Sequence, residues 1–479
     1  MKRSQFALLF LGIFLANIAI AQSNKRFGQL PSSMVRALKQ SRIPISHISM
    51  FVQDVDQRGA TLALNSQLAM NPASTMKLVT TYAALELLGP AYIWKTEVYA
   101  VSDIKNGVLD GDLILKGYGD PTLNLESFWL LLRQLRQRGL KEINGNLVLD
   151  RSYFEIIEQD PAKFDNEPLR AYNVTPDALL VNFKTIRFQF IPNYEKKLVT
   201  IVPDPNPENL EVINNVRLVP GNNCTDWHKK ILTALKTDAK TINMIFDGPY
   251  PENCGEQFLH FSTLDHAQYV NMVFRQLWKE LGGSIKGKLL ENPVPLNAKL
   301  LYVHESIDTL SEVVRNVNKF SNNVMARQVF LTMAANFTGQ PARVDQGVST
   351  TKAWLTSKKL NFPELKIENG AGLSRQERIS AAHMGALLVQ AYKSPVMPEF
   401  IASMPLVGND GTMRKRLIQR GVSGQAHIKT GTLEGVKTLA GYVFSKSGRR
   451  YVVVLFINHP NAVNGEAVQD AFLEWVYSK

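Results

Sequence analysis

Residues 71–77 read NPASTMK and place a serine and a lysine three positions apart at the start of a predicted helix. Side chains three apart on a helix lie on one face, so the Lys77 amine can lie beside the Ser74 hydroxyl. A serine hydroxyl becomes a nucleophile when a neighbouring base takes its proton, and lysine serves where its site lowers its pKa. The helix N-terminus adds a positive dipole near a developing oxyanion. The segment therefore predicts Ser74 as a nucleophile and Lys77 as its base.

The same spacing occurs at two other places in the chain, Ser102 with Lys105 and Ser349 with Lys352. Ser102 is followed by an Asn-Gly turn at residues 106–107, which argues against a sustained helix there. Ser349 can begin a helix, but it comes later in the chain than the partner motif at residues 321–323. Spacing alone is therefore a weak signal, and the partner motifs decide between the three serines.

Two partner motifs follow in chain order. Residues 321–323 read SNN and open an apolar helix, where such a run by itself is an ordinary polar cap. Residues 429–431 read KTG and lie on a predicted strand, where glycine lets a substrate backbone come close and lysine and threonine can hold an anionic terminus. Ser-x-x-Lys, Ser-x-Asn and Lys-Thr-Gly in this order form the motif set of penicillin-binding proteins and class A β-lactamases.

Hydrophobic periodicity predicts matching structure at the two ends of the chain. We expect them to share one antiparallel sheet flanked by helices. The N-terminal pieces are a helix at 31–42 and strands at 45–55 and 61–64; the C-terminal pieces are strands at 426–430, 439–444 and 451–458 and a helix at 466–477.

The middle of the chain has short alternating strands separated by turn residues, which predicts a β-rich insert. Strands are expected at 107–115, 146–150, 185–191, 197–202 and 210–218, and helices at 126–138 and 266–281. We therefore expect a catalytic domain at 22–93 and 294–479, an inserted domain II at 94–165 and 262–293, and an inserted domain III at 166–261.

The N-terminus has the layout of a secretory signal peptide, with Lys2 and Arg3, an apolar run at 6–20 and small residues before Gln22. The run is shorter than the roughly 20 residues that cross a bilayer, so we expect cleavage after about Ala21, an exported periplasmic protein and no integral membrane anchor. The formal charge is +12. Export argues against a nucleic-acid partner, and an acidic cell-wall polymer fits both the location and the charge.

The chain has two cysteines, Cys224 and Cys254. In an oxidising compartment an even pair predicts one disulfide, and the alternative is two buried free thiols. The eight histidines are scattered and no CxxC or HExxH pattern occurs, so we expect neither a metal site nor a cofactor.

Beyond the three motifs, the chain resembles the low-molecular-mass class C penicillin-binding proteins, the D-alanyl-D-alanine carboxypeptidase and endopeptidase family, over nearly its whole mature length. The long interval between the first two motifs fits this family, which carries two extra domains there. A compact β-lactamase has no such insertion. Two departures are Asn369, where the family has an aspartate, and Arg327, where an acidic residue is expected. Both bear on substrate preference. The matching runs are 71–74 (NPAS), 119–123 (GDPTL), 369–375 (NGAGLSR) and 408–412 (GNDGT).

The resemblance implies an α/β (α+β) penicillin-recognising serine transpeptidase-like fold with two inserted β-rich domains. It also implies cleavage of peptidoglycan stem peptides and cross-links through a Ser74 acyl-enzyme. Lys77 would take the hydroxyl proton, Ser321 or Lys77 would protonate the leaving group, and Asn323 would orient Lys77 and the peptide amide. β-Lactam antibiotics would be covalent inhibitors.

For the third motif the resemblance implies a substrate-binding role. Lys429 and Thr430 would bind the substrate carboxylate beside Gly431. The backbone N–H groups of Ser74 and Thr432 would form the oxyanion hole. Two other functions are open from the residues alone: a wall-binding or scaffolding protein with a vestigial site, and a secreted β-lactamase-like hydrolase.

Overall fold

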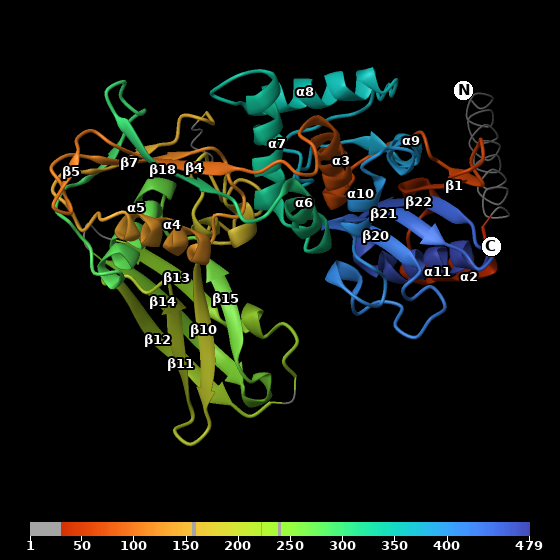
Figure 1. The fold of residues 1–479 in the computed structure, drawn as a ribbon. Helices are drawn as coiled ribbons and strands as arrows, with labels where there is room; N and C mark the ends of the chain where they lie inside the picture. The colour runs from red at the N-terminus through yellow and green to blue at the C-terminus, as the bar shows by residue number, and fades with distance from the viewer. Residues whose placement is uncertain (1–29, 156–159, 222, 238–240) are drawn as a thin grey trace, which may run out of the picture. The chain divides into compact units, whose positions relative to one another are not determined.

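The computed structural model describes residues 30–155, 160–221, 223–237 and 241–479, and the predicted signal peptide at 1–21 lies outside them. The chain divides into two compact units (Figure 1). The first consists of Met1–Tyr92 as far as it is described, Leu310–Ala326 and Val344–Lys479. The second consists of Ile93–Thr309 and Arg327–Arg343.

The first unit is built on a five-stranded sheet with the order β2-β1-β22-β21-β20. All its neighbouring strands are antiparallel, with Met50 opposite Leu455 and Leu439 opposite the same residue on the other side. The two ends of the chain therefore form one sheet, as the periodicity predicts. The strands are β1 (Ile48–Asp54), β2 (Leu62–Leu64), β20 (Ala426–Leu433), β21 (Val436–Phe444) and β22 (Arg450–Asn458).

Helices cover both faces of this sheet. On one face α2 (Ser32–Ser41) lies beside α11 (Glu466–Tyr477), and their buried Met34 and Phe472 belong to one apolar core with the sheet (Figure 1). On the other face α9 (Ala381–Tyr392) packs on β1 and β22. Both faces of the central strands are buried, which explains the uninterrupted apolar run of β22.

One helix of the first unit, α3 (Lys77–Leu87), is surrounded by other elements, and nine of its eleven residues are buried. A helix that is buried all round must be apolar or hydrogen-bonded on every face, which α3 satisfies with alanine, leucine, valine and paired threonines. It contacts α6 (Leu310–Lys319), α8 (Val344–Ser357) and α10 (Met397–Ala402). The start of α3 is therefore held in place from several sides.

The second unit contains three sheets over one extended core. Two smaller sheets have the orders β17-β9-β7-β4-β18 and β16-β8-β6-β5. The buried faces of α4 (Leu125–Gln137) and α5 (His266–Glu280) belong to the same core. The strands are β4 (Lys95–Ala100), β5 (Ile104–Lys105), β6 (Val108–Leu109), β7 (Leu113–Gly117), β8 (Glu142–Ile143), β9 (Leu147–Asp150), β16 (Ser284–Ile285), β17 (Leu289–Glu291) and β18 (Lys299–Glu305).

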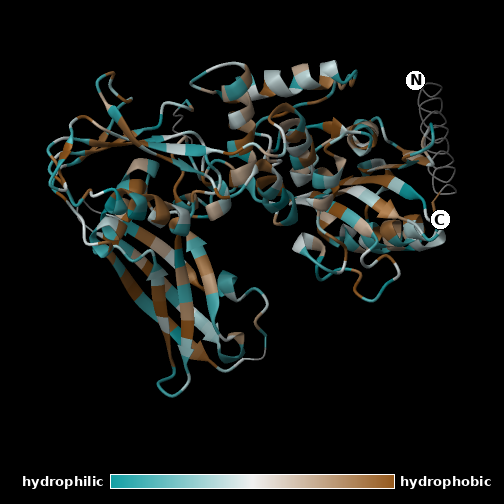
Figure 2. Cartoon of the chain, viewed as in Figure 1, coloured by the Kyte–Doolittle hydropathy of each residue, from teal (hydrophilic) through white to brown (hydrophobic). Residues whose placement is uncertain are grey.

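The third sheet of this unit has six strands in the order β13-β14-β12-β11-β10-β15. Brown and teal bands alternate along its strands in Figure 2, because one face is buried and the other is exposed. The strands are β10 (Ile186–Asn193), β11 (Leu198–Asp204), β12 (Leu210–Val219), β13 (Leu232–Thr237), β14 (Ile242–Pro251) and β15 (Gln257–Phe261).

The predicted fold class is confirmed, and the differences lie in individual strands. The strand expected at 107–115 is two strands, β6 and β7, because the chain bends between them at Asp110 and Gly111, where Gly111 lies against Ser102. The periodicity did not predict several strands, among them β4, β13, β14, β15 and β18. Gly248 and Pro249 within β14 are residues that usually argue against a strand. The boundaries of domains II and III stay a prediction.

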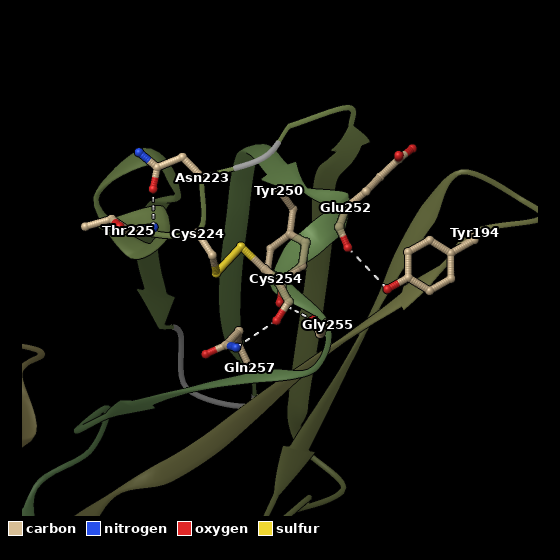
Figure 3. Close-up of a disulfide and its surroundings, with 9 residues drawn as sticks. All are labelled: Tyr194, Asn223, Cys224, Thr225, Tyr250, Glu252, Cys254, Gly255 and Gln257. Carbon is tan, nitrogen blue, oxygen red and sulfur yellow. Dashed lines mark hydrogen bonds between the residues drawn. A yellow bond between two sulfur atoms is a disulfide. The ribbon is translucent and has the colours of Figure 1, made fainter. Parts of the chain in front are cut away.

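Cys224 and Cys254 form a disulfide, as predicted, at the end of the six-stranded sheet (Figure 3). Cys254 is buried, and its carbonyl accepts a hydrogen bond from the Gln257 side chain at 2.8 Å. The bond connects the segment before β13 with the turn that follows β14. Within the described part of the chain, no helix is long and apolar enough to cross a membrane.

Reducing this disulfide should destabilise the six-stranded sheet. The bond closes a loop over a separation of 30 residues, so its loss should lower the free energy of unfolding by roughly 3 to 4 kcal/mol. Urea unfolding with and without dithiothreitol measures the difference. A variant with both cysteines replaced by alanine is the control, since reductant should not change its midpoint. An unchanged midpoint of the reduced wild-type protein would contradict the prediction.

Candidate active site

Ser74 lies in a short 3-10 turn, η2 (Ala73–Met76), that leads directly into α3. The preceding Ala73 has a left-handed backbone with φ 51°, a conformation that costs energy for a residue with a Cβ. The Asn71 side chain holds this turn: its oxygen accepts from the Ala73 N–H at 2.9 Å, and its nitrogen donates to the Ser374 carbonyl at 2.8 Å. Ser74 itself is half-buried, so its hydroxyl is oriented but reachable.

Lys77 is fully buried, and its ammonium lies among oxygen atoms. Its Nζ is 3.1 Å from Ser74 Oγ and 2.6 Å from Asn323 Oδ1, and it also donates to the Ala371 carbonyl. These contacts use three acceptors for the three N–H bonds of an ammonium. The predicted pairing of Ser74 with Lys77 is therefore present, and Asn323 of the second motif joins it.

Ser321 links α6 to α7 (Asn323–Phe337), and its backbone is left-handed with φ 57°. Its hydroxyl accepts a hydrogen bond from Lys429 Nζ at 2.9 Å. The neighbouring Asn322 instead caps the helix, because its side chain accepts from the Met325 N–H at 3.0 Å. The second motif thus contributes Asn323 to the surroundings of Lys77 and Ser321 to those of Lys429.

Lys429 on β20 is fully buried and donates to Ser321 Oγ and to the Thr430 carbonyl at 2.8 Å. Desolvation by burial disfavours its charged form and lowers the pKa of Lys429 to about 7. A binding site with this lysine can therefore present either a cation or a neutral amine near neutral pH.

Glycine is required at position 431, because the strand passes directly beside the nucleophile turn. A Cβ on Gly431 would lie 2.8 Å from the Ser74 nitrogen and 2.3 Å from Thr438 Oγ1. Thr438 on β21 donates to the Pro72 carbonyl at 2.7 Å, which joins the sheet to the same turn. The third motif is thereby placed against Ser74. The exposed Thr432 follows on the same strand.

Two parts of the site had no chemical role in the sequence analysis. Thr412 Oγ1 is 2.9 Å from Thr430 Oγ1, so the run at 408–412 reaches the third motif. The run at 369–375 packs against the nucleophile turn: a Cβ on Gly372, which has φ 79°, would lie 1.6 Å from the Ala73 carbonyl oxygen. In the sequence, the closely spaced glycines at 370 and 372 are the signal that could have indicated this close backbone contact.

The two departures from the family pattern have clear contacts. The Asn369 side chain accepts from the Ala371 N–H at 2.9 Å and donates to the Leu373 carbonyl at 2.8 Å, and an aspartate could not make the second bond. Arg327 lies in the second unit and donates to the Val174 carbonyl at 3.2 Å.

The two other Ser-x-x-Lys sequences have no such surroundings. Ser102 precedes the β5–β6 hairpin and is not in a helix. Ser349 is exposed within α8, and its hydroxyl donates to the Gln346 carbonyl at 2.8 Å. Among the described residues, no group of three or more His, Cys, Asp or Glu side chains is placed to hold a metal ion.

Comparison with solved structures shows a penicillin-binding protein fold. Penicillin-binding protein 4 (dacB) from Haemophilus influenzae superposes with a TM-score of 0.77 at 23% identity, over 94% of this chain and all of that one. A complex of the same protein with a β-lactam superposes with a TM-score of 0.74.

The sequence relatives agree with this fold. The D-alanyl-D-alanine carboxypeptidase DacB of Haemophilus influenzae is 25% identical over 96% of this chain and 94% of its own length. The D-alanyl-D-alanine carboxypeptidase of Actinomadura sp. is 27% identical over 84% of this chain and 75% of its own length. The D-Ala-D-Ala carboxypeptidase 3 (S13) family matches residues 30–478, and the chain belongs to this family.

Replacing Gly372 by alanine should destabilise the first unit, because the new Cβ would overlap the Ala73 carbonyl. We expect a loss of more than about 1 kcal/mol in the free energy of unfolding, measured by chemical denaturation. Gly448→Ala is a matched control, since Gly448 has the same φ of 79° with nothing within 4 Å of the added carbon. Equal losses for the two variants would show that the close approach to Ala73 is unimportant.

Proposed function

We propose that this protein is an exported serine D-alanyl-D-alanine carboxypeptidase and endopeptidase that cleaves peptidoglycan peptides through an acyl-enzyme on Ser74. The 3.1 Å contact between Lys77 Nζ and Ser74 Oγ carries the proposal, because it brings a base to the hydroxyl. Membership of the D-Ala-D-Ala carboxypeptidase family supports the substrate class. The apolar N-terminal run and the basic charge of +12 support export to an acidic wall polymer.

In the acylation step, Lys77 as a neutral amine takes the proton of Ser74 while Oγ attacks the carbonyl of the D-Ala-D-Ala bond. The tetrahedral oxyanion accepts hydrogen bonds from the backbone N–H groups of Ser74 and Thr432. As the C–N bond breaks, the proton passes to the departing D-alanine amine from Lys77 or through Ser321. Asn323 holds Lys77 in place at 2.6 Å.

In the second step, water attacks the ester on Ser74 and releases the shortened peptide with its new carboxylate. The terminal carboxylate of the substrate binds Lys429 and Thr430 before acylation, and their position beside Gly431 supports this role. A β-lactam presents a carboxylate and a reactive amide in a similar arrangement. It acylates Ser74 by ring opening, so no leaving group departs and the adduct persists.

The purified mature protein should bind labelled penicillin covalently and release D-alanine from stem peptides ending in D-Ala-D-Ala. Ser74→Ala should abolish both, because no other group supplies the acyl acceptor. Ser349→Ala is the matched control and should keep both, since Ser349 has the same spacing to a lysine but lies exposed in α8. Mass analysis of digested wall fragments separates D-alanine release from the splitting of cross-links.

The outcomes also distinguish the alternatives. Labelling that survives in Ser74→Ala would refute the assignment of the nucleophile. A wild-type protein that binds wall fragments without cleaving them would support a scaffolding role. Rapid turnover of penicillin in place of a stable adduct would support a β-lactamase-like hydrolase.

The non-covalent affinity for penicillin should fall as the pH rises through the pKa of Lys429, about 7. The penicillin carboxylate stays ionised over this range, while the lysine loses its charge above its pKa. The dissociation constant should therefore increase by up to about tenfold per pH unit above that point. Equilibrium binding to Ser74→Ala, which cannot be acylated, measures it. A constant affinity between about pH 6 and pH 9 would contradict the role of Lys429.

A further inference from the structure

A fully buried carboxylate, Glu377, lies behind the loop that contacts Lys77. Its Oε1 accepts hydrogen bonds from three consecutive backbone N–H groups: Glu368 at 3.0 Å, Asn369 at 3.1 Å and Gly370 at 3.3 Å. Three donors on one oxygen form a turn that closes around the carboxylate. This oxygen therefore sets the backbone of the residues that lead into Ala371.

The backbone held in this way aims the Ala371 carbonyl at the catalytic centre. That carbonyl accepts a hydrogen bond from Lys77 Nζ. The loop is fixed at neighbouring points as well, because Thr80 on α3 donates to the Gly370 carbonyl at 2.6 Å and Asn369 accepts from the Ala371 N–H. Removing Glu377 would take away the acceptor shared by the three backbone N–H groups that precede Ala371.

The charge of Glu377 also acts on the site. Burial raises the pKa of Glu377, and the three N–H groups and the positive charge of Lys77 oppose that rise. Oε2 is buried and has no hydrogen-bond partner within the described structure. A buried carboxylate with an unpaired oxygen is energetically unfavourable. Here the loop N–H groups and the positive charge of Lys77 offset part of that cost.

We propose that Glu377 is a positioning residue for Lys77: its carboxylate orders the loop at 368–370, which holds the Ala371 carbonyl on the Lys77 ammonium, and supplies a buried negative charge behind that loop. This inference rests on the proposed function, in which Lys77 is the base for Ser74. Glu377 touches neither substrate nor nucleophile and acts through the loop and Lys77.

The same arrangement accounts for Asn369. A carboxylate at position 369 would lose the bond to the Leu373 carbonyl and would place a second negative charge beside Glu377, whose Oε1 already accepts the N–H of this residue. Like charges that share a buried site cannot both be stable. The buried side of the loop thus accommodates one acid, at position 377, while the Glu368 side chain of the same loop is exposed.

The variant Glu377→Gln tests the proposal because it keeps the size of the side chain and one acceptor oxygen but removes the charge. We expect the rate constant of Ser74 acylation by labelled penicillin to fall roughly 10- to 100-fold, because a neutral amide oxygen holds the three loop N–H groups more weakly than a carboxylate and the Ala371 carbonyl then positions Lys77 less well. The dissociation constant of the initial non-covalent complex should stay unchanged, since Lys429 and Thr430 are untouched. Stopped-flow labelling over a range of penicillin concentrations separates the two constants.

Glu368→Gln is the matched control. It removes a carboxylate from the same loop. The exposed Glu368 side chain accepts a hydrogen bond from the Ser374 hydroxyl, which a glutamine oxygen can keep, so the acylation rate constant should stay at the wild-type value. A Glu377→Gln protein that acylates as fast as Glu368→Gln would overturn the proposal. Failure of the wild-type protein to label at Ser74 would instead overturn the proposed function, and the two failures are thus distinguishable.

A second experiment does not require the single variant Glu377→Gln. Asn369→Asp should slow acylation by adding a second acid beside Glu377. The double variant Asn369→Asp with Glu377→Gln returns to a single acid there, so its acylation should be faster than that of Asn369→Asp alone. Thermal unfolding of both variants is measured alongside. A double variant that is no faster than Asn369→Asp would show that the two positions do not share one charge, and would overturn the proposal.

Discussion

The site depends on one buried ammonium. A lysine can be buried only where acceptors replace the water it loses, and Lys77 has the Ser74 hydroxyl, the Asn323 side chain and the Ala371 carbonyl around it. These acceptors come from three separate parts of the first unit. The buried Lys77 charge is stable only when all three acceptors are in place. The fold that provides these acceptors therefore also brings the catalytic groups together around Ser74.

Close backbone contact is the second constraint. Gly431 on β20 and Gly372 in the run at 369–375 both approach the nucleophile turn more closely than a side chain would allow. The left-handed residues Ala73 and Ser321 lie at the same centre. Strain of this kind persists only where the surroundings determine the backbone strongly, and here α3 and the five-stranded sheet do so. The hydroxyl is therefore presented from a rigid support.

The two buried lysines of the site differ in their compensation. Glu377 lies behind the loop at Lys77 and provides a negative charge in addition to neutral acceptors. Lys429 donates to the Ser321 hydroxyl and to the Thr430 carbonyl, and desolvation lowers its pKa to about 7. An incoming carboxylate would supply the negative charge that is missing from the contacts of Lys429. Lys429 is therefore suited to binding an anion, and Lys77 to transferring a proton.

Relations that are short in range or periodic could be predicted from the amino-acid sequence. The spacing of Ser74 and Lys77 follows from helix geometry, and the alternating strands at both chain ends predicted one shared sheet. Which carbonyl faces Lys77 depends on the folded chain, because Ala371 is 294 residues away and a backbone carbonyl has no sequence signature. The same holds for Glu377, whose importance comes from burial, and for β14, where Gly248 and Pro249 obscured a strand that its neighbours in the sheet stabilise.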